Sequence, residues 1–208
     1  MVVVVCAVLG VVAGVFGDRV VRCLGEGAGV RRPALEALVG LAFGAVGRQV
    51  GGWDWALPGL LLFTWTLVIV AVIDARTRRI PNRLTYPLTP TLLGLLVVAA
   101  LLNGEPFRAQ GALLGGLTAF SALLVLALAN PRGMGMGDVK LAGFIGVGLG
   151  YLSWGTLITG MLAGFALGGL VALGLLATRL RRRSDLIPFG PYLAAGAFLA
   201  LLAGCRMR

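Results

Sequence analysis

The chain contains no histidine, and only 8 of its 208 residues are acidic. The absence of histidine excludes Ser-His-Asp triads, Cys-His pairs and histidine-ligated metal sites. Charged residues of both signs make up 12% of the chain, whereas about 25% is usual for soluble domains. So few charges cannot cover a surface that faces water, and this excludes a soluble globular enzyme.

Cysteine is equally scarce, with Cys6, Cys23 and Cys205 as the three examples. None belongs to a C-x-x-C pair, and an odd number of cysteines far apart in sequence is not a disulfide framework. Small thiols are common among buried residues in apolar segments. We therefore interpret all three cysteines as packing residues and expect no metal site and no cofactor.

The chain is rich in apolar residues instead: 59% of it is hydrophobic, 33 residues are glycine, and the mean hydropathy is +0.97. These values predict an all-α, polytopic helical membrane protein whose single integral-membrane domain spans residues 1–208. The first apolar run is expected to be a retained span and not a signal peptide, because Asp18-Arg19 follows it in place of a small-residue cleavage site. The apolar segments cover residues 1–16, 34–50, 57–74, 87–102, 111–129, 139–152, 155–178 and 188–205.

The number of spans depends on residues 141–178, which contain no charge and are too long for one helix. A turn near Ser153-Trp154-Gly155 would divide them and give about eight transmembrane helices. Seven is the alternative count. Glycines at positions 160, 164 and 168 recur every four residues, which places them on one helix face where they allow close helix packing. Gly111 and Gly115 are expected to act in the same way.

The basic residues favour eight spans. Fourteen of the 18 lie in alternate connecting segments, as the positive-inside rule expects for cytoplasmic loops. Both termini are then outside the cell, and seven spans would leave the cluster at residues 179–183 outside as well. The charge of +10 is therefore a topology signal that needs no nucleic-acid partner, and the inner arginines are expected to contact anionic lipids. The fourteen are Arg19, Arg22, Arg31, Arg32, Arg76, Arg78, Arg79, Arg83, Arg132, Lys140, Arg179, Arg181, Arg182 and Arg183.

Two of the acidic residues differ from the other six, which fall in or beside loops. Asp74 ends an apolar run at the inner boundary of the third span, and Asp138 opens the sixth span at the same boundary. Two carboxylates in a partly desolvated site share a proton. The neutral acid can then donate to a carbonyl oxygen while the charged partner takes a proton from water, as in aspartic proteases. Gly135 and Gly137 would permit unusual backbone angles and a close substrate strand.

Position alone leaves alternatives open. The two aspartates could instead form a proton or cation relay in a transport protein, or serve as structural partners of Arg76, Arg78 or Lys140. A purely structural membrane subunit is a third interpretation. For Lys140, we favour extension toward the lipid headgroups over an influence on Asp138. Arg78, Arg79 and Asn82 are interpreted as loop and interface residues.

The residues around the two aspartates add a family resemblance. The segment Gly-Met-Gly-Asp-Val-Lys-Leu at 135–141 resembles the G-x-G-D motif of membrane-embedded aspartic proteases, and specifically that of the prepilin peptidase (type IV leader peptidase) family. Asp74 followed by Ile-Pro-Asn-Arg-Leu-Thr at 80–85 is similar to that family's first catalytic segment. Ile-Pro-Phe-Gly-Pro at 187–191 resembles its C-terminal element, and Arg-Pro-Ala-Leu-Glu at 32–36 resembles the segment that opens its second span.

The resemblance implies an endopeptidase of the cytoplasmic (inner) membrane that removes the short leader from pilin-like precursors after a glycine. Asp74 and Asp138 would be the catalytic pair, on the cytoplasmic side. The residues expected to support them are Gly135, Gly137, Lys140, Pro81, Asn82, Pro188, Phe189 and Gly190.

One departure from the family pattern concerns the first cytoplasmic loop. Many bacterial members carry two zinc-binding C-x-x-C pairs there and also N-methylate the new pilin N-terminus. Here the loop is shortened to about residues 17–33 and contains only Cys23, whereas a closed zinc site needs four ligands. We therefore expect a short form without the zinc module, in which N-methyltransferase activity is doubtful.

Overall fold

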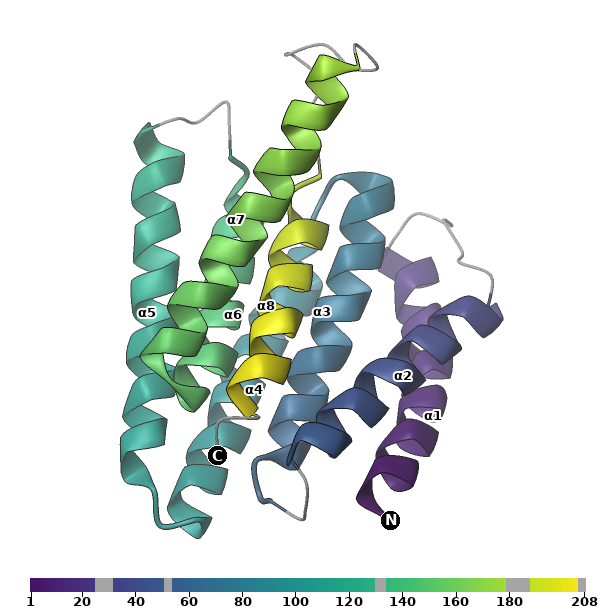
Figure 1. Ribbon diagram of the computed structural model, residues 1–208, viewed down its shortest axis with the longest axis vertical. Coiled ribbons are helices and arrows are strands. Elements are labelled where there is room, and N and C mark those ends of the chain that lie inside the picture. The colour runs from purple at the N-terminus through teal and green to yellow at the C-terminus, as the bar shows by residue number, and fades with distance from the viewer. Residues whose placement is uncertain (25–31, 51–53, 130–133, 179–187, 206–208) are drawn as a thin grey trace.

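The described residues form eight α-helices that run alternately up and down (Figure 1). The structure, a computed structural model, describes residues 1–24, 32–50, 54–129, 134–178 and 188–205, and within these ranges it contains no β-strand. The helices are α1 (Val2–Leu24), α2 (Arg32–Val50), α3 (Leu57–Thr77), α4 (Asn82–Leu102), α5 (Pro106–Ala129), α6 (Met136–Leu152), α7 (Trp154–Ala177) and α8 (Gly190–Cys205).

Five of the helices, α1, α3, α4, α5 and α7, are long and apolar enough to cross a membrane. α6 and α8 are apolar but have only 17 and 16 residues. The prediction of an all-α, multi-pass membrane protein is therefore confirmed. Residues 25–31 of the predicted first loop and the arginine cluster at residues 179–183 lie outside the described residues.

The predicted break between the sixth and seventh helices is present. Ser153 separates α6 from α7 in an extended conformation, with φ −172° and ψ 161°. Its Oγ accepts a hydrogen bond of 3.0 Å from the backbone N–H of Thr156, which is the usual N-cap arrangement at a helix start.

Three predicted helix boundaries were wrong by five residues or more, and one of them is the start of α5, at Pro106 instead of residue 111. α1 does not end near residue 16 but continues to Leu24, so residues 17–24 belong to a helix and not to the first loop. The extra turns are supported by an ion pair of 3.0 Å between Asp18 and Arg22, one helical turn apart. α4 begins at Asn82 instead of residue 87, because Pro81 takes the N-cap position and polar residues can extend a helix beyond the apolar layer.

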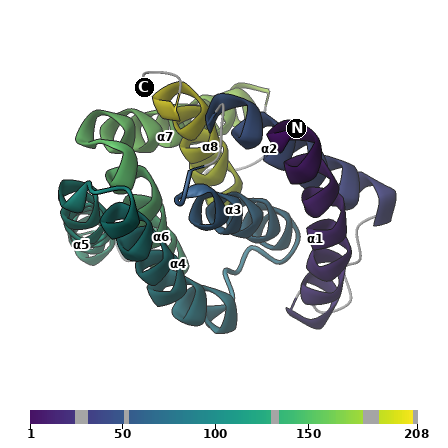
Figure 2. The ribbon, with the colours of Figure 1, turned by 90° about the horizontal axis from the view of Figure 1, so that it is seen from below.

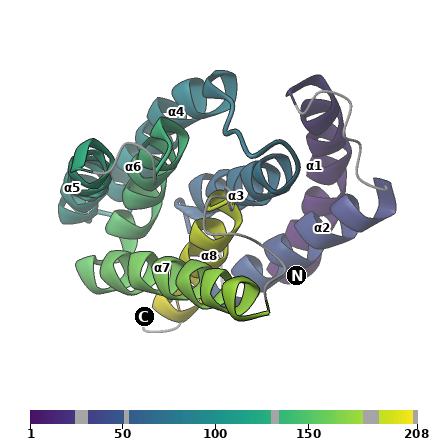
Figure 3. The same cartoon turned by 90° about the horizontal axis from the view of Figure 1, so that it is seen from above.

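α3 lies at the centre of the bundle, where it packs on α1, α2, α4, α6 and α8 (Figures 2 and 3). The pair α1 and α2 lies on one side of it, and α4, α5 and α6 lie on the other. The carboxyl end of α3 and the amino ends of α4, α6 and α8 meet at the upper end of the bundle in Figure 1. This meeting of four helix ends positions the functional site.

Glycines allow two helix pairs to pack with backbones in close contact. A Cβ added at Gly115 would lie 2.9 Å from the Cα of Gly150, so the α5–α6 seam has no room for a side chain there. In the α7–α8 seam, a Cβ at Gly164 would lie 2.9 Å from the Cα of Leu193. The predicted packing role of these glycines is therefore confirmed.

Candidate active site

Asp74 lies in the last turn of α3 and is only 4% exposed. The helix ends one turn later because Arg78 adopts the left-handed conformation, with φ 53°, and its backbone N–H donates to the carbonyl oxygen of Asp74 at 2.8 Å. This is a common way to end a helix. It fixes the aspartate on rigid backbone where the chain leaves α3.

The Asp74 carboxylate is held by a different helix. The backbone N–H of Gly190, the first residue of α8, donates a hydrogen bond of 2.9 Å to Oδ2 of Asp74. The amino end of a helix has unpaired N–H groups and a partial positive charge, which both favour a carboxylate. A Cβ at position 190 would lie 2.8 Å from this same oxygen, so only glycine allows the contact.

Asp138 lies in the first turn of α6, half-buried, and its backbone N–H donates to the carbonyl oxygen of Gly135 at 3.0 Å. The expectation of unusual backbone angles here was wrong. Gly135 has φ −81° and ψ 149°, which any residue adopts, and Gly104 is the one described glycine with positive φ. Close approach is nevertheless required at Gly137, where a Cβ would lie 3.0 Å from the Cβ of Ile80.

Asp74 and Asp138 line one cavity of about 340 Å³ at this end of the bundle. Its wall also includes Gly135, Gly137, Asn82 and Lys140, so six of the ten predicted site residues meet there. The other four residues do not line the cavity. Pro81 is the N-cap of α4, Gly190 binds Asp74, and Phe189 packs on the Phe165 ring at 5.1 Å beside Pro188.

We had expected the Lys140 side chain to extend toward the lipid headgroups, but it turns toward α4 instead. Its Nζ donates a hydrogen bond of 2.8 Å to Oδ1 of Asn82 and lies 4.6 Å from the centre of the Tyr86 ring. The ammonium group is thus held between α4 and α6 at the wall of the cavity by a hydrogen bond and a cation–π contact. It joins the two helices on which Asn82 and Asp138 lie.

The sequence interpretation placed Arg78 and Arg79 in a loop and did not single out Ile80 or Met136, yet all four line the cavity. The signal that could have found them is their position, since they follow Asp74 or precede Asp138 by at most six residues. Both arginines bring positive charge to a site that contains two carboxyl groups.

This arrangement can activate water. Two carboxyl groups on different helices line one cavity that has room for several water molecules, and when one group is protonated and the other ionised they can act as acid and base together. In the ranges that the structure describes, no three His, Cys, Asp or Glu side chains cluster closely enough to hold a metal ion.

Comparison with known proteins assigns the chain to a family. The sequence profile described as the type IV leader peptidase family matches residues 61–173, a stretch that contains both aspartates. The chain belongs to the type IV leader peptidase family. Similar proteins include the prepilin leader peptidase/N-methyltransferase of Aeromonas hydrophila, which is 36% identical over 191 residues, or 88% of this chain and 62% of that protein.

Two more relatives with the same name extend the comparison. The Pseudomonas aeruginosa protein is 33% identical over 181 residues, covering 85% of this chain and 59% of the relative. The Neisseria gonorrhoeae protein is 37% identical over 126 residues, covering 58% of this chain and 42% of the relative. The chain thus spans about three-fifths of the first relative's length. No solved structure matches it.

Proposed function

We propose that this member of the type IV leader peptidase family is an aspartic endopeptidase that removes the leader from pilin-like precursors. The observation that carries the proposal is the shared cavity of Asp74 and Asp138 at one end of a membrane-spanning bundle. Relatives named prepilin leader peptidase support the choice of substrate class.

In the proposed reaction, the ionised carboxylate takes a proton from a water molecule in the cavity while the neutral carboxyl group donates to the carbonyl oxygen of the scissile bond. The water attacks the carbonyl carbon, and the carboxyl groups then return a proton to the departing amine. Gly190 keeps Asp74 in position through its 2.9 Å hydrogen bond. The pair needs neither histidine nor a metal to perform these steps.

The proposed setting is the inner membrane, with the site facing the cytoplasm and both termini outside. The support is the charge distribution, since the connecting segments and adjoining helix ends at the Asp74 end contain fourteen of the 18 basic residues. We restrict the proposal to proteolysis. The relatives' name includes N-methyl transfer, but Cys23 is the one cysteine between the first two apolar segments of this chain, where a zinc module needs four ligands.

The first prediction tests the catalytic pair. Asp74→Asn and Asp138→Asn each keep the side-chain shape but cannot alternate between acid and base, so each should lower precursor cleavage by at least about a hundredfold. Purified protein would be incubated with a pilin-like precursor, and mass spectrometry would identify the new N-terminus. The wild-type product should begin after a glycine and have no added methyl group.

Asp54→Asn is the matched control for this experiment. Asp54 lies at the opposite end of α3, where its Oδ1 accepts hydrogen bonds from the Ala56 backbone and the Asn103 side chain. An asparagine oxygen can accept both, so this variant should cleave normally. Normal cleavage by either Asp74→Asn or Asp138→Asn would overturn the proposal.

A further inference from the structure

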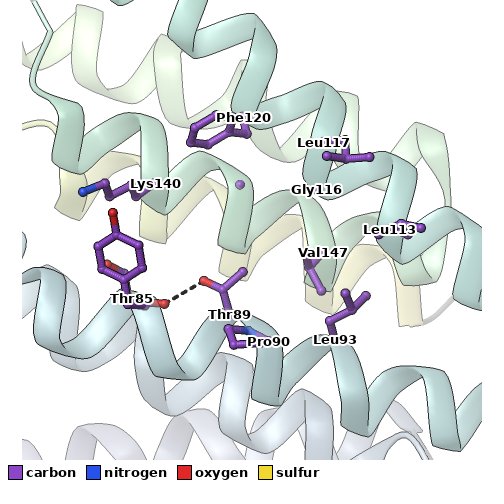
Figure 4. Close-up of a pocket in the computed structure, with 12 residues that line it drawn as sticks. Thr85, Thr89, Pro90, Leu93, Leu113, Gly116, Leu117, Phe120, Lys140 and Val147 are labelled. Atoms are coloured by element: carbon purple, nitrogen blue, oxygen red, sulfur yellow. Dashed lines mark hydrogen bonds between the residues drawn. The ribbon is translucent and has the colours of Figure 1, made fainter.

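A second cavity lies beside the proposed catalytic one, in a groove between α4, α5 and α6 (Figure 4). Its volume is about 350 Å³, a size that accepts a few side chains but not a whole helix. Thr85, Thr89 and Leu93 from α4 form one wall, and Leu113 and Leu117 from α5 form the facing wall. We call it the α4/α5/α6 groove.

The groove adjoins the catalytic cavity, and one lining residue is common to both. Lys140 lines both, and Asn82, which lines the cavity, precedes the groove residue Tyr86 by one turn of α4. From Thr85 to Leu93 the groove follows α4 away from the two aspartates for roughly 12 Å, at 1.5 Å per helical residue. A chain cut at Asp74 and Asp138 can therefore continue directly into it.

The lining of the groove indicates what enters it. Away from Lys140, the groove is lined by aliphatic, aromatic and hydroxyl side chains and contains no charge. Gly116 and Gly143 also line the groove, and both pack in the α5–α6 seam, where an added Cβ would lie 2.6 Å from Cγ2 of Val147 and 3.3 Å from Cβ of Phe120, respectively. The part of an occupant that lies in the groove must be apolar, and any polar part of it must lie at the end near Lys140 and the catalytic cavity.

Two hydrogen-bond acceptors belong to the groove residues that lie nearest Asn82 along α4. Thr85 is 2% exposed, and its hydroxyl has no hydrogen-bond partner in the described part of the chain. Pro90 has no N–H to donate to the carbonyl oxygen of Tyr86, four residues earlier on α4. The first four N–H groups of any helix lack internal partners, so a helix that begins here brings donors for the Tyr86 carbonyl oxygen, and it reaches the buried Thr85 hydroxyl only if the packing around Thr85 rearranges. A lipid acyl chain has no such donors.

We infer that the α4/α5/α6 groove binds the first turns of the precursor's hydrophobic helix, directly on the carboxyl side of the bond that is cut. This inference rests on the proposed function and adds the surface that recognises the substrate. A helix in an apolar groove is a recurrent recognition mode. The groove then places the scissile bond by holding the helix that follows it.

The test uses two substrates and a pair of leucine substitutions on α5. Leu117 lines the groove and is 55% exposed, whereas Leu114 is 48% exposed and does not line it. Leu117→Trp should fill the groove and lower kcat/KM for the intact precursor about tenfold or more, chiefly through KM. Cleavage of a soluble peptide that covers the junction but ends before the hydrophobic helix should not change.

Leu114→Trp should cleave both substrates like the wild type. The inference is overturned if Leu117→Trp cleaves the precursor normally or loses both substrates equally. If the wild type cleaves neither substrate, the proposed function itself fails, which is a distinguishable result.

A second measurement does not depend on activity. A photo-crosslinking amino acid at position 117 of the full chain should capture the precursor in liposomes, and the same probe at position 114 should not. Capture of lipid alone at position 117 would show that the groove is a lipid site and would overturn the inference.

Discussion

At the scale of single residues, the site depends on a contact between chain segments that are far apart. Asp74 and Gly190 are separated by 116 positions, yet the Gly190 N–H donates directly to the Asp74 carboxylate. The glycine is required because the carboxylate oxygen occupies the space of a Cβ. Gly190 is therefore a positioning residue whose effect acts through Asp74.

In Gly190→Ala the new methyl group would lie 2.8 Å from Oδ2 of Asp74. Because this is too close, the substitution should displace the Asp74 carboxylate. A displacement of about 1 Å in a catalytic group can cost on the order of a hundredfold in rate. We expect kcat to fall by that order while KM for the precursor changes little, because the groove is untouched. Steady-state kinetics with purified protein would separate the two parameters.

Gly94→Ala is the control for Gly190→Ala, since an added Cβ at Gly94 meets no atom within 4 Å. It should leave kcat unchanged and stabilise α4 slightly, because alanine favours helices over glycine. Equal rates for Gly190→Ala and the wild type would contradict the positioning role.

The sequence was sufficient to select Asp74 and Asp138, because each ends or begins an apolar segment and lies in a family motif. It could not reveal that Lys140 turns to Asn82 and Tyr86, since that contact joins α4 to α6 across 58 positions. The α4/α5/α6 groove was likewise hidden, because periodicity shows that a helix face is apolar but not which helix covers it.

At the scale of helices, the α7–α8 seam determines where the amino end of α8 lies. Three glycines of α7 each pack against one residue in or next to α8: Gly160 against Ala200, Gly164 against Leu193, and Gly168 against Phe189. The contact therefore reaches Phe189, the residue directly before Gly190. The seam therefore connects helix packing to the position of Asp74.

Gly164→Ala should loosen this seam, because its Cβ would lie 2.9 Å from backbone at Leu193. Overpacking of this kind costs about 1–3 kcal/mol, and a backbone neighbour cannot rotate away. Gly169→Ala, five residues along the same helix, meets no atom within 4 Å and should be tolerated. Thermal unfolding in detergent would measure both, and equal melting temperatures for the two variants would contradict the packing role of Gly164.

Helix number and order could be predicted from the sequence, since charge-free runs and the Ser153 break mark them directly. Helix ends were harder to predict. α1 continues past the end of its apolar run, where the Asp18–Arg22 ion pair lies. α4 begins five residues before the start of its apolar run. In both helices polar side chains continue the helix beyond the apolar layer, where hydropathy gives no signal.

At the scale of the whole molecule, an even number of helices places the start of α1 and the end of α8 at one end of the bundle, opposite the aspartates (Figure 1). The connecting segments and adjoining helix ends at the aspartate end contain most of the positive charge. If the positive-inside rule orients the chain, the end with Asp74 and Asp138 faces the cytoplasm.

Thiol labelling in intact cells tests this orientation. Cys23 is exposed near the carboxyl end of α1, which is the aspartate end, and Glu105 lies between α4 and α5 at the opposite end. Two single-cysteine proteins, one with native Cys23 and one with Glu105→Cys, would be made by replacing the other cysteines with serine. A membrane-impermeant maleimide should label the Glu105→Cys protein in intact cells but Cys23 only after permeabilisation. The reverse pattern would mean that the two carboxyl groups face away from the cytoplasm and that the charge distribution does not orient this bundle.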